Sequence, residues 1–258
     1  MPTTPHTAPK TTPLSKLELP CAVADLAIFL DFDGTLADIV EHPDDVLLLP
    51  ATRTAIVRLV ERTSGAVAVV TGRPIEQIDA LFDPLVLPVA GVHGMMRRDH
   101  AGALTRCDHD PALFAEAQAR LTRLHLANPD TMLEVKPGSL AFHYRRRPDL
   151  TETITARVHD ALGDLEGLDL LHGKMVLEVK AGHADKGSAI CAFMDEAPFA
   201  GRLPLFAGDD VTDEFGFRAI APAGISIKIG GGPTAARYSA SGAHAFRTWL
   251  SALAASRA

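Results

Sequence analysis

The chain alternates between short, continuous apolar runs and longer stretches in which apolar residues recur every three or four positions. Runs with the length of strands buried on both faces occupy residues 26–30, 66–70 and 86–90. Helical spacing lies between them, at Ile56 and Leu59 and then over residues 75–82, where Pro74 suits the first turn of a helix. This order predicts an α/β, doubly wound parallel sheet, or Rossmann-like core, with helices on both faces.

A different pattern fills the middle of the chain. Asp110-Pro111 opens one helical stretch, and a second contains Ile154, Val158 and Leu162. Segments that alternate apolar and polar residues, as antiparallel strands do, lie at residues 132–136, 140–145, 168–171 and 175–180. These features predict a smaller α+β module inserted into the core. The α/β pattern then resumes, with strands expected at residues 203–207 and 224–229 and a closing helix at 246–253.

The patterns divide the chain into three predicted parts. Residues 1–20 are rich in Pro and Thr and contain no apolar run, which predicts a disordered tail and excludes a secretory signal. The core domain is expected at residues 21–96 and 182–258, and the inserted cap domain at residues 97–181. No apolar run approaches the ~20 residues that a membrane-spanning helix needs, so the sequence predicts a soluble protein with no membrane partner.

Charge and cysteine content narrow the classes of function. The net charge of −7 argues against a nucleic-acid partner, which would need a basic patch to neutralise phosphates. The three cysteines, Cys21, Cys107 and Cys191, form no metal-binding or redox spacing, which predicts buried, reduced thiols and a cytoplasmic location. A monomer is the expected state.

Two carboxylates leave the first predicted strand together, in Asp31-Phe32-Asp33-Gly34-Thr35. Ligands of an open parallel sheet bind at the carboxyl ends of its strands, so Asp31 and Asp33 are expected at the edge of a site. Paired carboxylates need a partner for their charge, and a hard cation such as Mg²⁺ accepts oxygen ligands of this kind. An ordinary Asp-Gly turn after a strand is the alternative.

The DFDGTL segment resembles the first motif of the haloacid dehalogenase superfamily of phosphatases, and three further segments follow in that superfamily's order. They are Val69-Val70-Thr71-Gly72-Arg73, Asp185-Lys186-Gly187 and Gly208-Asp209-Asp210-Val211-Thr212-Asp213-Glu214. The resemblance implies Asp31 as nucleophile, Asp33 as general acid and base, and Thr71 and Lys186 as groups that hold the phosphoryl oxygens. It also implies a Mg²⁺ site made by the Asp31 carboxylate, the Asp33 carbonyl and the Asp209 carboxylate, with Asp210 and Asp213 beside it.

Alternation along the inserted strands separates an apolar face from a polar one. The polar face is expected to carry Glu134, Lys136, His143, Arg145, Glu178 and Lys180, while the apolar face packs on the two helices. A solvated sheet surface would look the same. Mixed acids and bases are also what a polyhydroxylated ligand needs, because its hydroxyls both donate and accept hydrogen bonds.

A closer resemblance, from about residue 26 to residue 250, is to the trehalose-6-phosphate phosphatases. It rests on Gly91-Val92-His93-Gly94, Glu134-Val135-Lys136, His143-Tyr144-Arg145 and Glu178-Val179-Lys180. The chain departs from that family at Lys180-Ala181, where a basic residue is often followed by Pro, which puts the role of Lys180 in doubt. The resemblance implies contacts to the phosphorylated sugar from Asp31, Phe32, Asp33, Gly72, Arg73, His93, Gly94, Glu134, Lys136, His143, Arg145 and Glu178.

The resemblance implies a Mg²⁺-dependent phosphatase that converts trehalose 6-phosphate to trehalose and phosphate through an aspartyl-phosphate. Two alternatives stay open. A related enzyme could act on sucrose phosphate or a hexose phosphate with the same core chemistry. A non-catalytic sugar-phosphate sensor on this scaffold could dispense with Asp33 or Lys186, and this chain has both.

Overall fold

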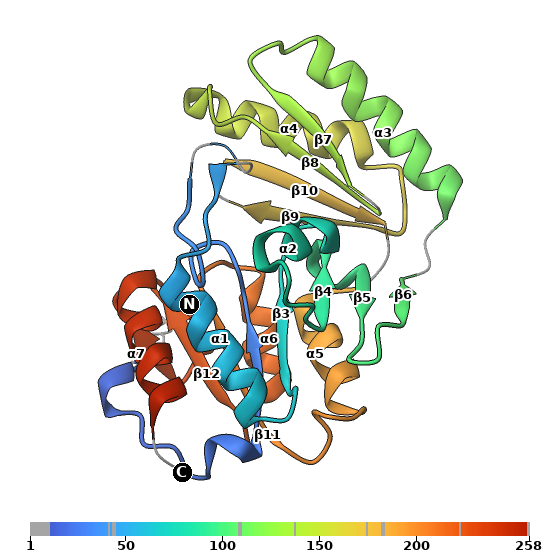
Figure 1. The fold of residues 1–258 in the computed structure, drawn as a ribbon. Coiled ribbons are helices and arrows are strands. Elements are labelled where there is room, and N and C mark those ends of the chain that lie inside the picture. The colour runs from blue at the N-terminus through green and yellow to red at the C-terminus, as the bar shows by residue number, and fades with distance from the viewer. Residues whose placement is uncertain are drawn as a thin grey trace, which may run out of the picture.

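Two sheets organise the molecule (Figure 1). The computed structural model describes residues 11–40, 42, 45–107, 110–136, 138–173, 175–181, 184–221 and 223–256. Within those residues, one sheet has nine strands and the other has four. The larger sheet forms the lower layer in Figure 1, and the smaller one lies above it with its own pair of helices.

The nine-stranded sheet is mostly parallel and is centred on the first predicted strand. Its strands, in spatial order, are β1 (Thr12–Pro13), β13 (Tyr238–Ala240), β12 (Ile225–Ile229), β11 (Leu203–Gly208), β2 (Leu26–Leu30), β3 (Val67–Val70), β4 (Val89–Gly91), β5 (Met96–Arg98) and β6 (Leu104–Arg106). Neighbours from β1 to β4 pair in parallel, and β5 and β6 continue the sheet in antiparallel fashion. The central strands β2, β11 and β3 are therefore covered on both sides, which explains their continuous apolar sequences.

Helices cover both faces of this sheet, as the apolar periodicity predicts. One face packs against α1 (Pro50–Arg62), α2 (Ile75–Phe82) and α7 (Ala243–Ala255), and the other against α5 (Lys186–Met194) and α6 (Asp213–Ile220). Side chains of β2 alternate between the two cores: Ile28 and Leu30 enter the first, Ala27 and Phe29 the second. The doubly wound α/β core is thus confirmed.

The smaller sheet and two helices form one unit, which we call the cap. Its elements are α3 (Pro111–Leu126), β7 (Met132–Lys136), β8 (Ser139–His143), α4 (Thr151–Leu162), β9 (Leu168–Gly173) and β10 (Val176–Ala181), with antiparallel strand order β7-β8-β10-β9. Apolar residues of both helices and of the sheet share one core, so the helices cover one sheet face. Asp110 caps α3 by accepting the Ala112 N–H at 2.8 Å, and Pro111 occupies the first turn, where its missing N–H costs nothing.

The described residues also contain short 3-10 helices at η1 (Leu14–Lys16), η2 (Val23–Asp25), η4 (Val92–Gly94) and η5 (Pro148–Leu150). No described helix has both the length and the apolar character needed to cross a membrane.

The structure differs from the expected boundaries in three places. Thr12–Pro13 pairs with β13, and the Leu14 side chain is buried, so this part of the predicted tail is ordered by strand pairing and by burial of one apolar side chain. Residues 1–10 lie outside the described residues. β5 and β6 extend the nine-stranded sheet although residues from 97 onward were assigned to the cap, so we propose to begin the cap at α3. β4 begins at Val89, and Val86, expected within it, is exposed.

None of the three cysteines forms a disulfide, as the spacing predicts, but their burial was predicted wrongly. Cys21 and Cys107 are partly buried, and Cys191 is exposed on α5.

Pro74 differs slightly from its expected place, because it is the residue preceding α2 rather than part of the first turn of that helix.

The aromatic cluster under the central strand makes a testable contribution to stability. Phe29 is fully buried, and its ring lies 5.3 Å from that of Phe199 and 5.9 Å from that of Phe193. We expect Phe29→Ala to lower the free energy of unfolding by about 3–5 kcal/mol, because it leaves a cavity at the centre of the sheet. Urea unfolding measures this change. Leu126→Ala, at a side chain that is 74% exposed, is the control and should stay within about 0.5 kcal/mol; equal losses would contradict the assignment of the core.

Candidate active site

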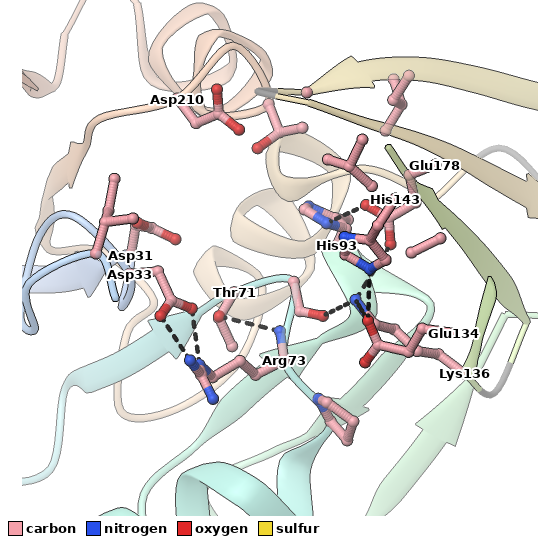
Figure 2. Close-up of a pocket in the computed structure, with 18 of the residues that line it drawn as sticks. Asp31, Asp33, Thr71, Arg73, His93, Glu134, Lys136, His143, Glu178 and Asp210 are labelled. Carbon is pink, nitrogen blue, oxygen red and sulfur yellow. Dashed lines mark hydrogen bonds and ion pairs between the residues drawn. The ribbon is translucent and has the colours of Figure 1, made fainter. Parts of the chain in front are cut away.

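A pocket lies between the core and the cap (Figure 2). The core contributes the loops after β2, β3 and β11 and the start of α5, and the cap contributes its sheet face opposite the helices. The predicted site residues that line it are Asp31, Asp33, Thr71, Gly72, Arg73, His93, Glu134, Lys136, His143, Arg145, Glu178, Lys186, Asp209 and Asp210. Asp31 and Asp33 thus line a pocket at the carboxyl end of β2, in agreement with the rule for open sheets.

Asp31 lies at the base of the pocket with both carboxylate oxygens held. Its Oδ1 accepts a hydrogen bond from Lys186 Nζ at 2.7 Å, and its Oδ2 accepts one from the Thr35 hydroxyl at 3.2 Å. The same ammonium donates to Asp213 Oδ1 at 2.6 Å. Burial alone would lower the pKa of Lys186, but the two carboxylates raise it, so the lysine remains a cation.

The acidic cluster fits a hard divalent cation. Carboxylate oxygens of Asp31, Asp209 and Asp213 lie within 4.8 Å of one another, the one such group among the described residues. Burial, and next the Asp213 and Asp210 carboxylates, raise the pKa of Asp209 to about 7, and burial likewise raises the pKa of Asp31. The single positive charge of Lys186 thus does not balance the negative charge of the three carboxylates. Their oxygens form the kind of ligand set that Mg²⁺ prefers.

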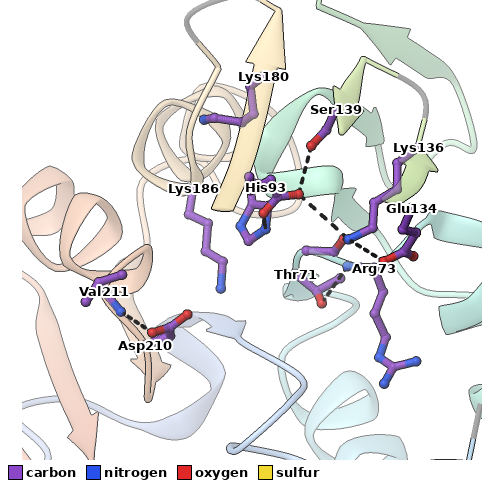
Figure 3. Close-up of polar contacts among 12 residues, drawn as sticks. Thr71, Arg73, His93, Glu134, Lys136, Ser139, Lys180, Lys186, Asp210 and Val211 are labelled. Atoms are coloured by element: carbon purple, nitrogen blue, oxygen red, sulfur yellow. Dashed lines mark hydrogen bonds and ion pairs between the residues drawn. The ribbon is translucent and has the colours of Figure 1, made fainter. Parts of the chain in front are cut away.

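The loop after β11 is fixed by its own backbone and by a buried lysine. The Asp210 N–H donates to Asp213 Oδ2 at 2.8 Å, and the Asp210 carboxylate accepts the Val211 N–H at 2.8 Å (Figure 3). From the neighbouring strand β12, the Lys228 ammonium donates to the carbonyl oxygens of Asp209 and Asp210. Lys228 was not predicted as a site residue, although a single lysine in the apolar strand Ile225–Ile229 was the available signal.

Asp33 turns its carboxylate toward Arg73, away from the cluster around Asp31 (Figure 2). Arg73 Nε lies 2.7 Å from Asp33 Oδ2, and Arg73 Nη2 lies 2.7 Å from Asp33 Oδ1. The Thr71 hydroxyl, predicted to hold a phosphoryl oxygen, accepts the Arg73 backbone N–H at 3.1 Å. The loop after β3 is therefore linked to the loop after β2 through Arg73, whose backbone is fixed by Thr71.

Charged residues of the cap face the pocket in a connected network (Figure 3). His143 Nε2 lies 3.0 Å from Glu134 Oε2, and Lys136 Nζ lies 3.7 Å from carboxylate oxygens of both Glu134 and Glu178. The hydrogen bond from His143 lowers the pKa of Glu134. Ser139, a residue the sequence did not single out, donates its hydroxyl to Glu178 Oε1 at 2.8 Å.

His93 joins the core to the cap. Its Nε2 lies 2.6 Å from Glu178 Oε2, and its ring packs so closely on Gly72 that a side chain there would meet it at 2.4 Å. Although burial would raise the pKa of Glu178, the charge of His93 and its hydrogen bond lower it overall. Val92 and His93 both have positive φ, 48° and 53°, a conformation that costs about 1–3 kcal/mol for such residues and recurs at functional sites.

Some predicted residues lie elsewhere. The Phe32 side chain is fully buried against Phe82, and neither Phe32 nor Gly94 is among the residues that line the pocket. Lys180 is buried on the polar side of the cap sheet, where its ammonium donates to the Ala184 carbonyl instead of facing the pocket. Val135, expected to pack on the helices, is exposed, because it belongs to the edge strand β7.

Comparisons with known proteins agree with this geometry. The family model described as trehalose-phosphatase matches residues 29–244. The chain is 38% identical to the trehalose-6-phosphate phosphatase of Escherichia coli (strain K12) over 242 residues, which cover 93% of this chain and 90% of that protein.

Solved structures show the same fold. The C-terminal domain of the trehalose-6-phosphate phosphatase of C. albicans superposes with a TM-score of 0.81 at 18% identity, covering 90% of this chain and 93% of that one. A haloacid dehalogenase-like hydrolase from B. subtilis gives a TM-score of 0.60 at 17% identity, covering 88% of this chain and 98% of the other. The core and cap thus adopt the haloacid dehalogenase-like arrangement.

The close approach of Asp209 to the first loop gives a test of the cation site. A Cβ atom on Gly34 would lie 2.2 Å from Asp209 Oδ2, so Gly34→Ala must displace that carboxylate. We expect Gly34→Ala to weaken Mg²⁺ binding, measured by isothermal titration calorimetry, by about 10–100-fold.

Gly102→Ala is the matched control. Gly102 has a similarly positive φ, 88° against 76° for Gly34, but nothing lies within 4 Å of the place that an added methyl group would occupy, so this variant shares the backbone strain alone. Mg²⁺ binding that is unchanged in Gly34→Ala, or equally weakened in both variants, would refute a site built on Asp209.

Proposed function

The chain belongs to the trehalose-phosphatase family, and from this premise we propose that it hydrolyses trehalose 6-phosphate to trehalose and phosphate, with Mg²⁺ as cofactor and Asp31 as nucleophile. The observation that carries the proposal is the buried Asp31–Lys186–Asp213 chain at the base of a pocket whose upper wall is the polar cap face. That arrangement pairs a carboxylate nucleophile with fixed cationic charge, and both lie under a surface suited to sugar hydroxyls.

Asp31, Asp209 and the Asp33 carbonyl are the groups that we propose hold Mg²⁺, with Asp213 and Asp210 shaping the loop around them. Bound there, the cation would neutralise phosphate charge and orient the phosphoryl group for in-line attack. Lys186 supplies a second positive charge from the protein itself, and the Thr71 hydroxyl supplies a hydrogen bond to a phosphoryl oxygen.

In the first half-reaction a carboxylate oxygen of Asp31 attacks phosphorus. The bond from phosphorus to the sugar oxygen breaks, and its electron pair leaves with that oxygen, which takes a proton from Asp33. An alkoxide is a poor leaving group, so this proton matters for a sugar phosphate. The products of this step are trehalose and an aspartyl-phosphate on Asp31.

In the second half-reaction water attacks the phosphorus of the aspartyl-phosphate. Asp33, now ionised, accepts the proton from this water, the bond from phosphorus to Asp31 breaks, and phosphate leaves. Asp31 and Asp33 return to their starting states. Acid–base help of this kind contributes ~10²–10⁴-fold to the rate.

The cap face selects the substrate in this proposal. Glu134, Lys136, His143, Arg145 and Glu178 all line the pocket, so acceptors and donors surround the space above Asp31. A site that hydrogen-bonds hydroxyls rejects analogues that lack them, because its own polar groups are then left unpaired. Cys21, Cys107 and Cys191 form no disulfide, which supports a reducing compartment, the cytoplasm, as the proposed place of action.

Phosphate release from trehalose 6-phosphate tests the proposal. We expect Mg²⁺-dependent turnover that EDTA stops and added Mg²⁺ restores, and slower turnover of sucrose phosphate and hexose phosphates.

Asp31→Asn should reduce the activity to below about a thousandth while the circular dichroism spectrum stays that of the folded protein, because the substitution preserves the shape of the side chain and removes the nucleophile. Full activity in EDTA would contradict the role of Mg²⁺, and more than about a tenth of wild-type activity in a folded Asp31→Asn variant would contradict Asp31 as the nucleophile.

If the cap selects the substrate, the effect of a cap substitution should depend on whether the phosphate ester carries a sugar. Glu134→Ala should lower kcat/KM for trehalose 6-phosphate by an amount worth about 2–4 kcal/mol, the scale of lost charged hydrogen bonds, and barely change it for 4-nitrophenyl phosphate. Val135→Ala is the control, since it changes the adjacent residue on the opposite, exposed side of the same strand. Equal losses on both substrates in Glu134→Ala would indicate a general role in folding or closure, and the solvated-face interpretation would hold.

A further inference from the structure

Arg73 makes contacts that point to a role different from sugar binding. The resemblance to the trehalose-6-phosphate phosphatases implies Arg73 as a substrate contact, but its guanidinium is committed to a protein carboxylate. We propose that Arg73 is a positioning residue that orients Asp33 for proton transfer and acts on the substrate only through Asp33. This inference rests on the proposed function, since it assumes that Asp33 is the general acid and base.

The contact between the two side chains is a two-pronged ion pair. Arg73 Nε and Nη2 each donate to a different oxygen of Asp33, both at 2.7 Å. Parallel bonds of this kind fix the plane of the carboxylate as well as its distance, which a single bond or a lysine cannot do. The rotation of the Asp33 carboxyl group is therefore set by the guanidinium (Figure 2).

Arg73 is itself held in place by neighbours on two sides. Its Nη1 donates to Gln77 Oε1 on α2 at 3.1 Å, and its guanidinium carbon lies 5.6 Å from the centre of the Phe32 ring. The Arg73 side chain is 10% exposed, whereas that of Asp33 is 40% exposed. A half-exposed carboxylate beside a glycine turn would otherwise sample several rotamers, and the buried arginine selects one.

The geometry also defines what must change during the reaction. As a general acid Asp33 carries a proton on one oxygen, and turning that O–H toward the leaving oxygen requires one of the two bonds to Arg73 to open. The second bond can remain and serve as a pivot that limits where the free oxygen swings. In each half-reaction the proton moves between Asp33 and the sugar oxygen or water, and Arg73 neither gives nor accepts one.

A direct substrate contact and a positioning role make different predictions. If Arg73 bound the phosphoryl group, its loss would slow every phosphate ester. If it bound the sugar, its loss would slow trehalose 6-phosphate whether or not Asp33 were present. If it acts through Asp33, its loss should matter only for poor leaving groups and only while Asp33 can transfer a proton.

A double-mutant cycle separates these possibilities. We would measure kcat/KM for trehalose 6-phosphate and for 4-nitrophenyl phosphate in the wild type, Asp33→Asn, Arg73→Gln and the double variant. We expect Arg73→Gln to lower kcat/KM for trehalose 6-phosphate by roughly 10–100-fold, less than the full ~10²–10⁴-fold acid–base contribution, and to change it less than about threefold for the aryl ester. In the Asp33→Asn background the same substitution should have no further effect.

Two further variants test the inference independently of folding defects. Gln77→Leu, which removes one support of Arg73, should reproduce the selective loss at smaller size. Arg98→Gln is the matched control: Arg98 also donates to both oxygens of a carboxylate, that of Asp79, through Nη1 and Nη2 at 2.7 and 2.5 Å, and it does not line the pocket. Arg98→Gln should leave both substrates unaffected, and a selective loss equal to that of Arg73→Gln would overturn the inference.

The outcomes also distinguish this inference from the proposed function. Additive losses from Arg73→Gln and Asp33→Asn in an active enzyme would overturn the positioning role alone. A wild-type protein that does not hydrolyse trehalose 6-phosphate would overturn the proposed function and the inference with it. Activity at the wild-type level in Arg73→Lys would also contradict the inference, because a lysine cannot hold both oxygens of Asp33.

Discussion

The ammonium of Lys186 between Asp31 and Asp213 is the interaction on which the rest of the site depends. All three side chains are buried, so each charge requires the others, and removal of one would leave a buried charge uncompensated. The ion chain also ties together the end of β2, the start of α5 and the start of α6. Since one lysine serves two carboxylates and Asp209 lies beside them, an excess of negative charge remains that a hard divalent ion can satisfy.

The loop after β3 connects the carboxylates of the core half of the pocket with the polar face of the cap. Its Gly72 carbonyl accepts a hydrogen bond from Lys136 of the cap at 3.4 Å, and its glycine leaves room for the His93 ring that bonds Glu178. The following residue, Arg73, holds the carboxylate of the loop after β2. A shift of the cap that moves Glu178 or Lys136 therefore acts on the same loop that holds the Asp33 carboxylate.

The sequence by itself determined the type of fold, the order of its central elements and the place of Asp31, Thr71, Lys186 and Asp209. The fold and the position of Asp31 follow from local periodicity and from the rule that polar residues at the carboxyl ends of parallel strands share one edge. The positions of Thr71, Lys186 and Asp209 were implied by the resemblance to the haloacid dehalogenase superfamily. Alternation along the cap strands likewise put the polar residues of the cap on one face before any contact was known.

Only the tertiary structure decided which of these residues are partners. Arg73 and Asp33 are forty positions apart in the chain, and nothing in either motif indicates that the arginine holds the carboxylate. The burial of Phe32, the edge position of β7 that exposes Val135, and the pairing of Thr12–Pro13 with β13 were equally hidden. Local spacing specifies which way a side chain points relative to its own strand or helix. A hydrogen bond such as the 2.7 Å contact between Arg73 and Asp33 depends instead on how separate elements pack, and that packing is settled only when the whole chain is folded.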